Sequence, residues 1–199
     1  MNYTDEQLMV RDMARQFAAD KLAPFAAEWD QKCEFPKAAI REMGELGLMG
    51  MVVPESFNGA ETDSIAYAMA LEEIASGDGA CSTIMSVHNS VGCLPVYRFG
   101  TEQQKQKWLP RLATGELLGS FCLTEPQAGS DASALKTTAR LITTDSGPAY
   151  QLDGVKQFIT SGKTLILPSF SQSQTAMQVK KASALLLYRR TPRVMKSLQ

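Results

Sequence analysis

The chain has 199 residues, of which 44% are hydrophobic and 21% charged, so its composition is ordinary for a globular protein and allows a substantial core. The formal net charge of -1 hides an asymmetry, because residues 164–199 contain six basic and no acidic residues, which leaves 14 basic and 21 acidic residues before them. A single domain seldom segregates charge in this way. The polar start and the lack of a long apolar stretch argue against a secretory signal and a membrane span, so we expect a cytoplasmic protein.

Helical periodicity dominates residues 1–116. Helices are predicted at 4–24, where Thr4 and Gln7 form a capping box, at 37–46, from the N-cap Asp63 through Ile74, at 80–99, and from Thr101 past a bend at Pro110. The stretch 80–99 is apolar on most sides, which predicts a central buried helix. It contains His88, the only histidine, which we expect to be a hydrogen-bonded core residue and not a catalytic one.

After Glu116 the pattern changes to Gly, Pro, Ser and Thr clusters with alternating residues at 137–142. The turn Asp153-Gly154, flanked by 150–152 and 157–160, is the strongest hairpin signal. We therefore predict an α+β chain, with an all-α amino-terminal domain at 1–116 and the start of a β domain at 117–163.

Cysteine spacing argues against both a disulfide framework and a zinc site, because no C-x-x-C pair is present. We expect four buried, reduced thiols, at Cys33, Cys81, Cys93 and Cys122. One histidine cannot form a multi-histidine metal site, so no metal is expected.

The distinctive segment is 121–131, FCLTEPQAGSD. An apolar strand leads into a turn at Pro126, and the small residues that follow leave backbone N–H groups open to a planar or anionic ligand. On these grounds alone, a polar turn between two strands is the default interpretation.

This segment closely resembles the signature of the acyl-CoA dehydrogenase family. Further family landmarks occur in the same order, at 26–30, 35–36, 47–50, 71–75, 86–89 and 99–105. The resemblance extends from the first helix through Lys163 and leans toward members that act on short or branched acyl chains. It implies a helical amino-terminal domain, a β-barrel-like middle domain and a carboxy-terminal helical bundle, of which the bundle is absent here.

The resemblance also implies an FAD site and a reaction. Contacts with FAD are implied for Phe121, Cys122, Leu123, Thr124, Glu125, Pro126, Gln127, Ala128, Gly129, Ser130, Phe158, Ile159 and Thr160. Thr124 would lie near the reactive edge of the flavin, Ser130 near the acyl-CoA, and Phe158 against the ring system. The implied reaction is α,β-dehydrogenation of an acyl-CoA thioester to a trans-2-enoyl-CoA, with an electron-transfer flavoprotein as acceptor.

The family's base is a glutamate of the third domain that has no counterpart here. We therefore predict no catalytic residue in this chain and expect an inactive fragment, in which Glu125 is a structural turn residue. The intact family forms homotetramers, and neither a nucleic acid nor a membrane is expected as a partner.

Residues 164–199 do not fit the resemblance. If ordinary codons are chosen for a typical continuation of the family sequence, reading them after the loss of one base gives the observed tail. We therefore hypothesise that a one-nucleotide deletion or sequencing error near the Lys163 codon produced an unrelated, disordered tail. The rival interpretation is a genuine basic tail for an anionic membrane or nucleic acid. Two functional alternatives also stay open: a non-catalytic helical module that binds a partner, and a flavin oxidase or hydroxylase of the same superfamily.

Overall fold

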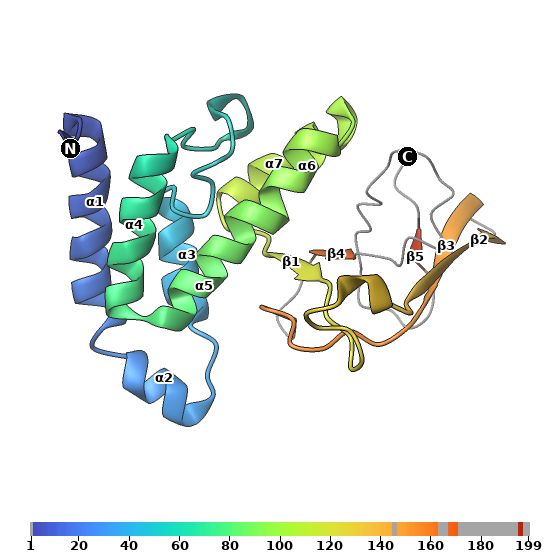
Figure 1. Cartoon of the computed structure of the whole chain (residues 1–199). Helices are drawn as coiled ribbons and strands as arrows, with labels where there is room; N and C mark the ends of the chain where they lie inside the picture. Colours follow the sequence, from blue (N-terminus) through green and yellow to red (C-terminus); the bar gives the residue numbers. More distant parts are fainter. Residues whose placement is uncertain (1, 145–146, 163–166, 171–194, 197–199) are drawn as a thin grey trace.

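The computed structural model describes residues 2–144, 147–162, 167–170 and 195–196. Helices occupy one end of the molecule and strands the other (Figure 1). The helices are α1 (Asp5–Phe17), η1 (Ala18–Leu22), α2 (Ala26–Lys32), α3 (Lys37–Glu45), η2 (Glu55–Phe57), α4 (Ser64–Gly77), α5 (Gly79–Val87), η3 (His88–Cys93), α6 (Leu94–Phe99), α7 (Glu102–Ala113) and η4 (Ala132–Ala134). None of the helices in these ranges has both the length and the apolar character that a membrane crossing requires.

The helix starts follow the capping signals in the sequence. At α1 the Thr4 hydroxyl accepts the Gln7 N–H, while the Gln7 side chain accepts the Thr4 N–H. The same reciprocal pair occurs at Thr101 and Gln104 before α7. These contacts satisfy N–H groups that have no partner inside the helix, so the predicted capping boxes are confirmed.

The central helix is continuous from α5 through η3 to α6, but η3 is a π-helical turn. Pro95 lies in the first turn of α6 and has no N–H to donate to the preceding turn, which accounts for the wider winding there. The buried amide of Asn89 donates to the carbonyl oxygens of Leu48 and Met85. This side chain therefore joins η3 to the segment that follows α3.

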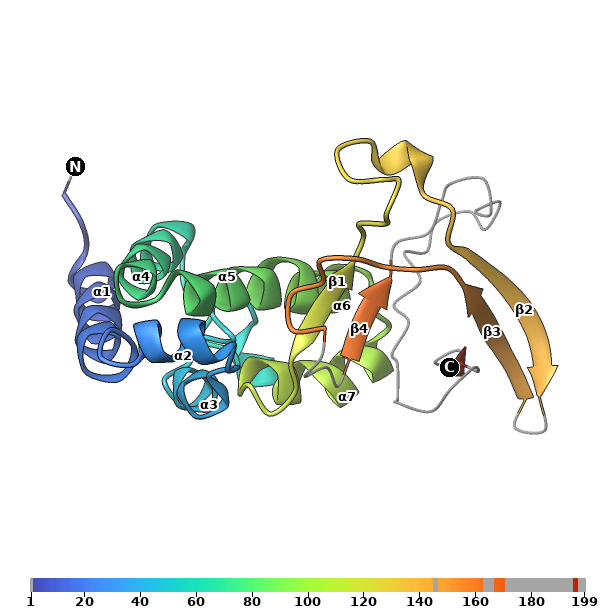
Figure 2. The same cartoon turned by 90° about the horizontal axis from the view of Figure 1, so that it is seen from below.

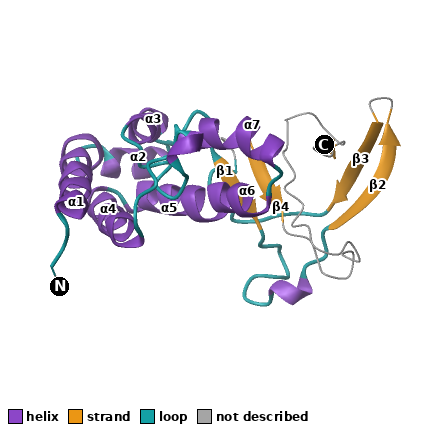
Figure 3. Cartoon of the chain, turned by 90° about the horizontal axis from the view of Figure 1, so that it is seen from above, coloured by secondary structure: helices purple, strands orange, loops and turns teal. Residues whose placement is uncertain are grey.

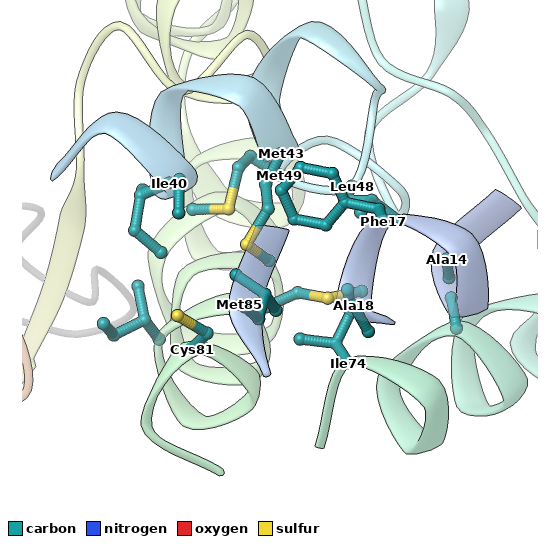
Figure 4. Packing of buried hydrophobic residues seen from close by; sticks show 14 of the residues in the cluster. Ala14, Phe17, Ala18, Ile40, Met43, Leu48, Met49, Ile74, Cys81 and Met85 are labelled. Carbon is teal, nitrogen blue, oxygen red and sulfur yellow. The ribbon is translucent and has the colours of Figure 1, made fainter. Parts of the chain in front are cut away.

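The main core lies between α1, α3, α4 and α5 (Figure 4). Ala14, Phe17, Ile40, Met43, Leu48, Met49, Ile74 and Met85 are buried together in it. Small residues allow α1 and α4 to approach, and flexible methionines fill the irregular space beside α3. A second cluster, around Leu109 and Leu112, joins α7 to α6.

Helix α2 was not predicted, and it has no buried residue. It packs Trp29 against the main core, but a seven-residue helix with one such contact has no apolar stripe by which to recognise it. It ends at Cys33, which adopts a left-handed conformation and is exposed. The expectation of four buried thiols is therefore wrong for Cys33 and confirmed for Cys81, Cys93 and Cys122.

Two small sheets form the other end of the chain (Figure 2). Strand β1 (Gly119–Cys122) pairs in parallel with β4 (Leu167–Phe170), with Gly119 opposite Leu167. Strand β2 (Thr138–Thr144) forms an antiparallel hairpin with β3 (Gly147–Asp153), and β5 (Met195–Lys196) pairs with the outer side of β3. The α+β class is confirmed.

The hairpin turn lies before β3, not at Asp153-Gly154 as predicted. Gly154 follows the end of β3 and packs against Thr137, where a Cβ atom would lie 2.2 Å from the threonine hydroxyl oxygen. The glycine therefore permits a close approach between segments and does not close a hairpin. Residues 157–160, predicted as a strand, form turns and bends beside β1 instead.

The predicted disorder of residues 164–199 falls mostly outside the described residues. Strands β4 and β5 are exceptions, because both are paired with other strands. The disorder expected for residues 164–199 therefore stays a prediction.

Candidate functional site

The segment 121–131 leaves β1 as a compact, internally bonded loop, which we call the signature loop (Figure 2). Glu125 and Ala128 exchange both of their backbone hydrogen bonds at 3.0 Å, which closes a tight turn over Pro126 and Gln127. The Asp131 carboxylate accepts the backbone N–H of Ser133 and so caps the short helix η4. The turn predicted from Pro126 and the small residues after it is present.

Glu125 is buried beneath this turn. Its carboxylate accepts the backbone N–H groups of Lys136 at 2.7 Å and Thr137 at 3.0 Å, the ammonium group of Lys156 at 2.8 Å and the side-chain amide of Gln127 at 2.7 Å. Burial alone would raise the pKa of this carboxyl, but the ammonium and the two N–H groups outweigh it and hold the pKa well below its usual range. A carboxylate stabilised in this way is a weak base, as expected of a structural turn residue.

The second predicted segment, 158–160, lies against the signature loop. Lys156 donates to the Leu123 carbonyl oxygen at 2.9 Å, and the Gln157 N–H donates to the Thr124 carbonyl oxygen at 2.8 Å. On the neighbouring strand, the Ser120 hydroxyl donates to the Thr160 carbonyl oxygen. The structure thus brings together two stretches that are about thirty residues apart in the sequence.

Three groups on these two segments are exposed, have free space beside them or lack a hydrogen-bond partner among the described residues. Phe158 is 85% exposed, and its backbone has a positive φ of 57°, which is uncommon for an aromatic residue. A Cβ atom built on Gly129 would meet nothing within 4 Å. Within the described residues, neither the N–H nor the hydroxyl of Thr124 has a hydrogen-bond partner. An exposed ring, polar groups without partners and free space beside a glycine fit a planar, polar ligand such as a flavin.

The other predicted residues are distributed over the loop in three kinds of environment. The buried residues are Cys122, Glu125 and Ala128. The half-buried ones are Phe121, Leu123, Thr124, Ile159 and Thr160, and the exposed ones are Pro126, Gln127, Gly129 and Ser130. Burial raises the pKa of the Cys122 thiol to about 11, although nearby Lys156 lowers it, so this thiol is neutral near pH 7. Only part of the signature therefore presents side chains to a ligand.

His88 connects the helices to β1. Its Nδ1 accepts the Gly119 N–H at 3.0 Å, and its Nε2 therefore carries the proton and donates to the Leu112 carbonyl oxygen at 2.9 Å. Burial lowers the pKa to about 4, so the ring is neutral. The expectation of a hydrogen-bonded core imidazole is confirmed.

Lys156 was missed in the sequence, although its side chain contacts the signature loop at two points. A lysine among exposed residues has no feature that predicts burial, and the opposite charge that holds it lies in another segment. A hollow of about 640 Å³ between α3 and the segment before β1, lined by Ile40, Arg41 and Leu118 among others, includes none of the predicted site residues. Within the described ranges, no group of three or more His, Cys, Asp or Glu residues is arranged to hold a metal ion.

Both the sequence and the fold of this chain are similar to those of known proteins. Residues 4–116 match the model of the acyl-CoA dehydrogenase N-terminal domain, and residues 120–196 match that of the middle domain. An acyl-CoA dehydrogenase of Bacillus subtilis (strain 168) is 46% identical over 162 residues, which cover 81% of this chain and 42% of the relative. The mitochondrial short-chain specific acyl-CoA dehydrogenase of Rattus norvegicus is 42% identical over 185 residues, covering 92% of this chain and 44% of the relative.

A solved acyl-CoA dehydrogenase from Bacillus anthracis, complexed with FAD, has a TM-score of 0.77 and 37% identity, covering 84% of this chain and 28% of that one. The chain thus spans less than half the length of these relatives. The middle-domain match and the alignment with the rat protein both include residues after Lys163, where the resemblance was expected to stop. Whether those residues come from a shifted frame stays a prediction.

Proposed function

Because the chain belongs to the acyl-CoA dehydrogenase family, whose members are FAD-dependent oxidoreductases, we propose that residues 121–130 and 158–160 form part of an FAD site. The reaction proposed for the whole protein is α,β-dehydrogenation of an acyl-CoA thioester to the trans-2-enoyl-CoA. FAD supplies the hydride acceptor when it is bound, and the protein supplies binding, orientation and exclusion of water.

The observation that carries this proposal is the position of Phe158. Its ring is exposed, its backbone is held in an uncommon conformation, and the residue before it is bonded to Thr124. Residues held in uncommon backbone conformations cluster at ligand sites, and an exposed aromatic ring at such a residue is suited to cover a planar ligand. The N–H and hydroxyl of Thr124, which have no hydrogen-bond partner among the described residues, give the same ligand a polar edge to contact.

The roles of the remaining residues follow from their environments. Ser130, exposed at the end of the signature loop, is the proposed contact with acyl-CoA. Glu125 acts in the fold and not as a base, because donors already occupy its carboxylate. The family's glutamate base has no counterpart in this sequence, so we propose that the 199-residue chain binds FAD without turning over acyl-CoA.

The finer assignments rest on the family and on similarity to particular relatives. Similarity to a short-chain specific enzyme favours a short acyl chain and a role in fatty-acid breakdown, and a branched acyl chain from amino-acid breakdown is the alternative proposal. An electron-transfer flavoprotein as acceptor, a homotetramer for the whole protein and a cytoplasmic location are proposals of the same kind, as are the domain boundaries at 116 and 163.

Titration of FAD into the purified chain tests the proposal. We expect the Phe158→Ala variant to raise the Kd for FAD about tenfold, since loss of aromatic stacking on a planar ring is worth roughly 1–3 kcal/mol. The control is Phe99→Ala, because Phe99 is also exposed, at 68%, but lies at the end of α6 in the helical part. This variant should leave the Kd unchanged.

Other results would favour the alternatives. A folded chain that never binds FAD contradicts the proposal and supports a helical partner-binding module. A chain that binds FAD and releases peroxide rapidly on addition of acyl-CoA supports an oxidase. Reduction of bound FAD by acyl-CoA without peroxide would support dehydrogenase chemistry but contradict the proposed inactivity.

A further inference from the structure

Glu125 and Lys156 form an ion pair inside the proposed site without facing its open side. Their side chains are 2% and 7% exposed, and the ammonium nitrogen lies 2.8 Å from the carboxylate oxygen. We propose that this pair is a positioning device, which holds the two FAD-contacting segments in the one relative arrangement that admits the cofactor. The inference rests on the proposed function and extends it to two side chains that act by holding other contacts in place.

Burial makes the pair an unusual choice for stability alone. Removing two charges from water is costly, and apolar residues of the same size often stabilise a protein equally well. This cost is offset here because the Glu125 carboxylate accepts hydrogen bonds from four donors: two backbone N–H groups, a side-chain amide and an ammonium group. Such directional contacts define a geometry far more narrowly than apolar packing does.

That geometry is transmitted to the proposed ligand contacts through adjacent residues. Thr124 immediately precedes Glu125, and its carbonyl oxygen accepts the N–H of Gln157, the residue after Lys156. Phe158 comes next. Glu125 is thus one residue from Thr124, and Lys156 is two residues from Phe158. The ion pair therefore sets the distance between the polar groups of Thr124 and the ring of Phe158.

Lys156 also donates to the Leu123 carbonyl oxygen, which adds a second point of attachment to the signature loop. Two attachments from one ammonium group prevent the 155–160 segment from sliding along the loop. Figure 2 shows this segment, in orange, running back beside β1. Loss of the ammonium group should release this segment while the helices at the other end of the molecule stay intact.

The experiment compares Lys156→Met and Glu125→Gln, which preserve shape and remove charge, with Lys21→Met in the complete 199-residue chain. Lys21 is a matched control because it pairs with Glu42 at 3.0 Å, but that pair is exposed and lies among the helices. Helical circular dichroism verifies that each variant is folded. The readouts are the Kd for FAD, the visible circular dichroism of bound FAD, and amide hydrogen exchange without FAD.

We expect both charge-removing variants to raise the Kd for FAD about tenfold or more, by analogy with supporting partners in other ligand sites. The visible circular dichroism of FAD, measured at saturation, should change in both, and the double variant should cost less than the product of the single effects because the two residues act as a unit. Lys21→Met should change none of these. Unchanged FAD binding and spectra in folded Lys156→Met protein would overturn the inference.

Hydrogen exchange separates failure of this inference from failure of the proposed function. In the FAD-free chain, the amides of Lys136, Thr137 and Gln157 should exchange at least about tenfold more slowly than that of exposed Ser130, and Lys156→Met should remove the difference. If the chain binds no FAD but shows this exchange pattern, the proposed function is contradicted, whereas the role of the ion pair in ordering the loop is supported. If these three amides exchange as fast as that of Ser130 in the unaltered chain, the proposed positioning role of the Glu125–Lys156 pair is contradicted.

Discussion

The helical part and the signature loop are held together by different forces. Among the helices, the buried residues are almost all apolar, and methionine, leucine and alanine side chains fill the space between α1, α3, α4 and α5. Beneath the loop, the decisive contacts are an ion pair and hydrogen bonds that converge on Glu125. Figure 3 shows how these two regions lie at either side of β1.

Stability and geometry are therefore divided between the two regions. Apolar burial is non-directional, so it stabilises the helices without defining each side-chain position closely. Hydrogen bonds and ion pairs are directional, and a loop that must present a ring and an N–H group to one ligand needs them. Substitutions in each region should therefore affect different measurements.

The largest expected effect is on stability, from truncating a buried core residue. Leu48→Ala should lower the free energy of unfolding by about 2–5 kcal/mol, because it removes apolar contacts and leaves a cavity. Leu141→Ala in β2, where the side chain is 62% exposed, should change it by less than about 0.5 kcal/mol. Urea unfolding followed by helical circular dichroism measures both, and equal effects would show that Leu48 does not stabilise the helical core.

The stability of the chain should depend on pH through His88, which links α7 to β1. His88 is neutral in the folded chain because burial lowers its pKa from 6.5 to about 4, whereas in the unfolded chain it binds a proton near pH 6.5. The contribution of His88 to the free energy of unfolding is therefore complete above pH 6.5. It is lost as the pH falls toward 4, by roughly 3 kcal/mol at most.

Unfolding measured between pH 7 and pH 5 isolates this effect, since carboxyl groups with lowered pKa values, such as Glu125, release their stabilisation only at lower pH. His88→Gln has no titratable ring, so its stability should be nearly constant over this range although lower at pH 7. A decline in the variant as steep as in the unaltered chain would exclude His88 as its source.

The smallest of these effects comes from a close contact between α3 and the segment before β1. A Cβ atom on Gly44 would lie 2.2 Å from the Thr114 carbonyl oxygen, so Gly44→Ala should destabilise the chain by about 1–3 kcal/mol. Gly79→Ala is the control, since a Cβ atom there meets nothing within 4 Å, and it should stabilise α5 by up to about 1 kcal/mol. Thermal unfolding distinguishes the two, and a neutral Gly44→Ala would show that this contact relaxes freely.

Local signals predicted the helices well. The capping pairs at Thr4 and Thr101 and the N-cap Asp63 are short-range patterns, and each makes the contact expected of it. The hairpin was placed wrongly because a turn dipeptide such as Asp153-Gly154 has the same local preference whether it closes a hairpin or allows contact with a distant residue. Thr137, which packs against Gly154, lies too far along the chain to be part of that pattern.

Local sequence patterns were enough to predict the capped helices, the α+β class and the family, because these depend on periodicity, capping residues and the signature segment at 121–131. Only the tertiary structure decided that Lys156 is buried against Glu125, that Phe158 is left exposed, and that His88 joins α7 to β1. The physical reason is that burial and ion pairing depend on which distant segments meet. That meeting is settled by the packing of the whole chain and not by the preferences of neighbouring residues.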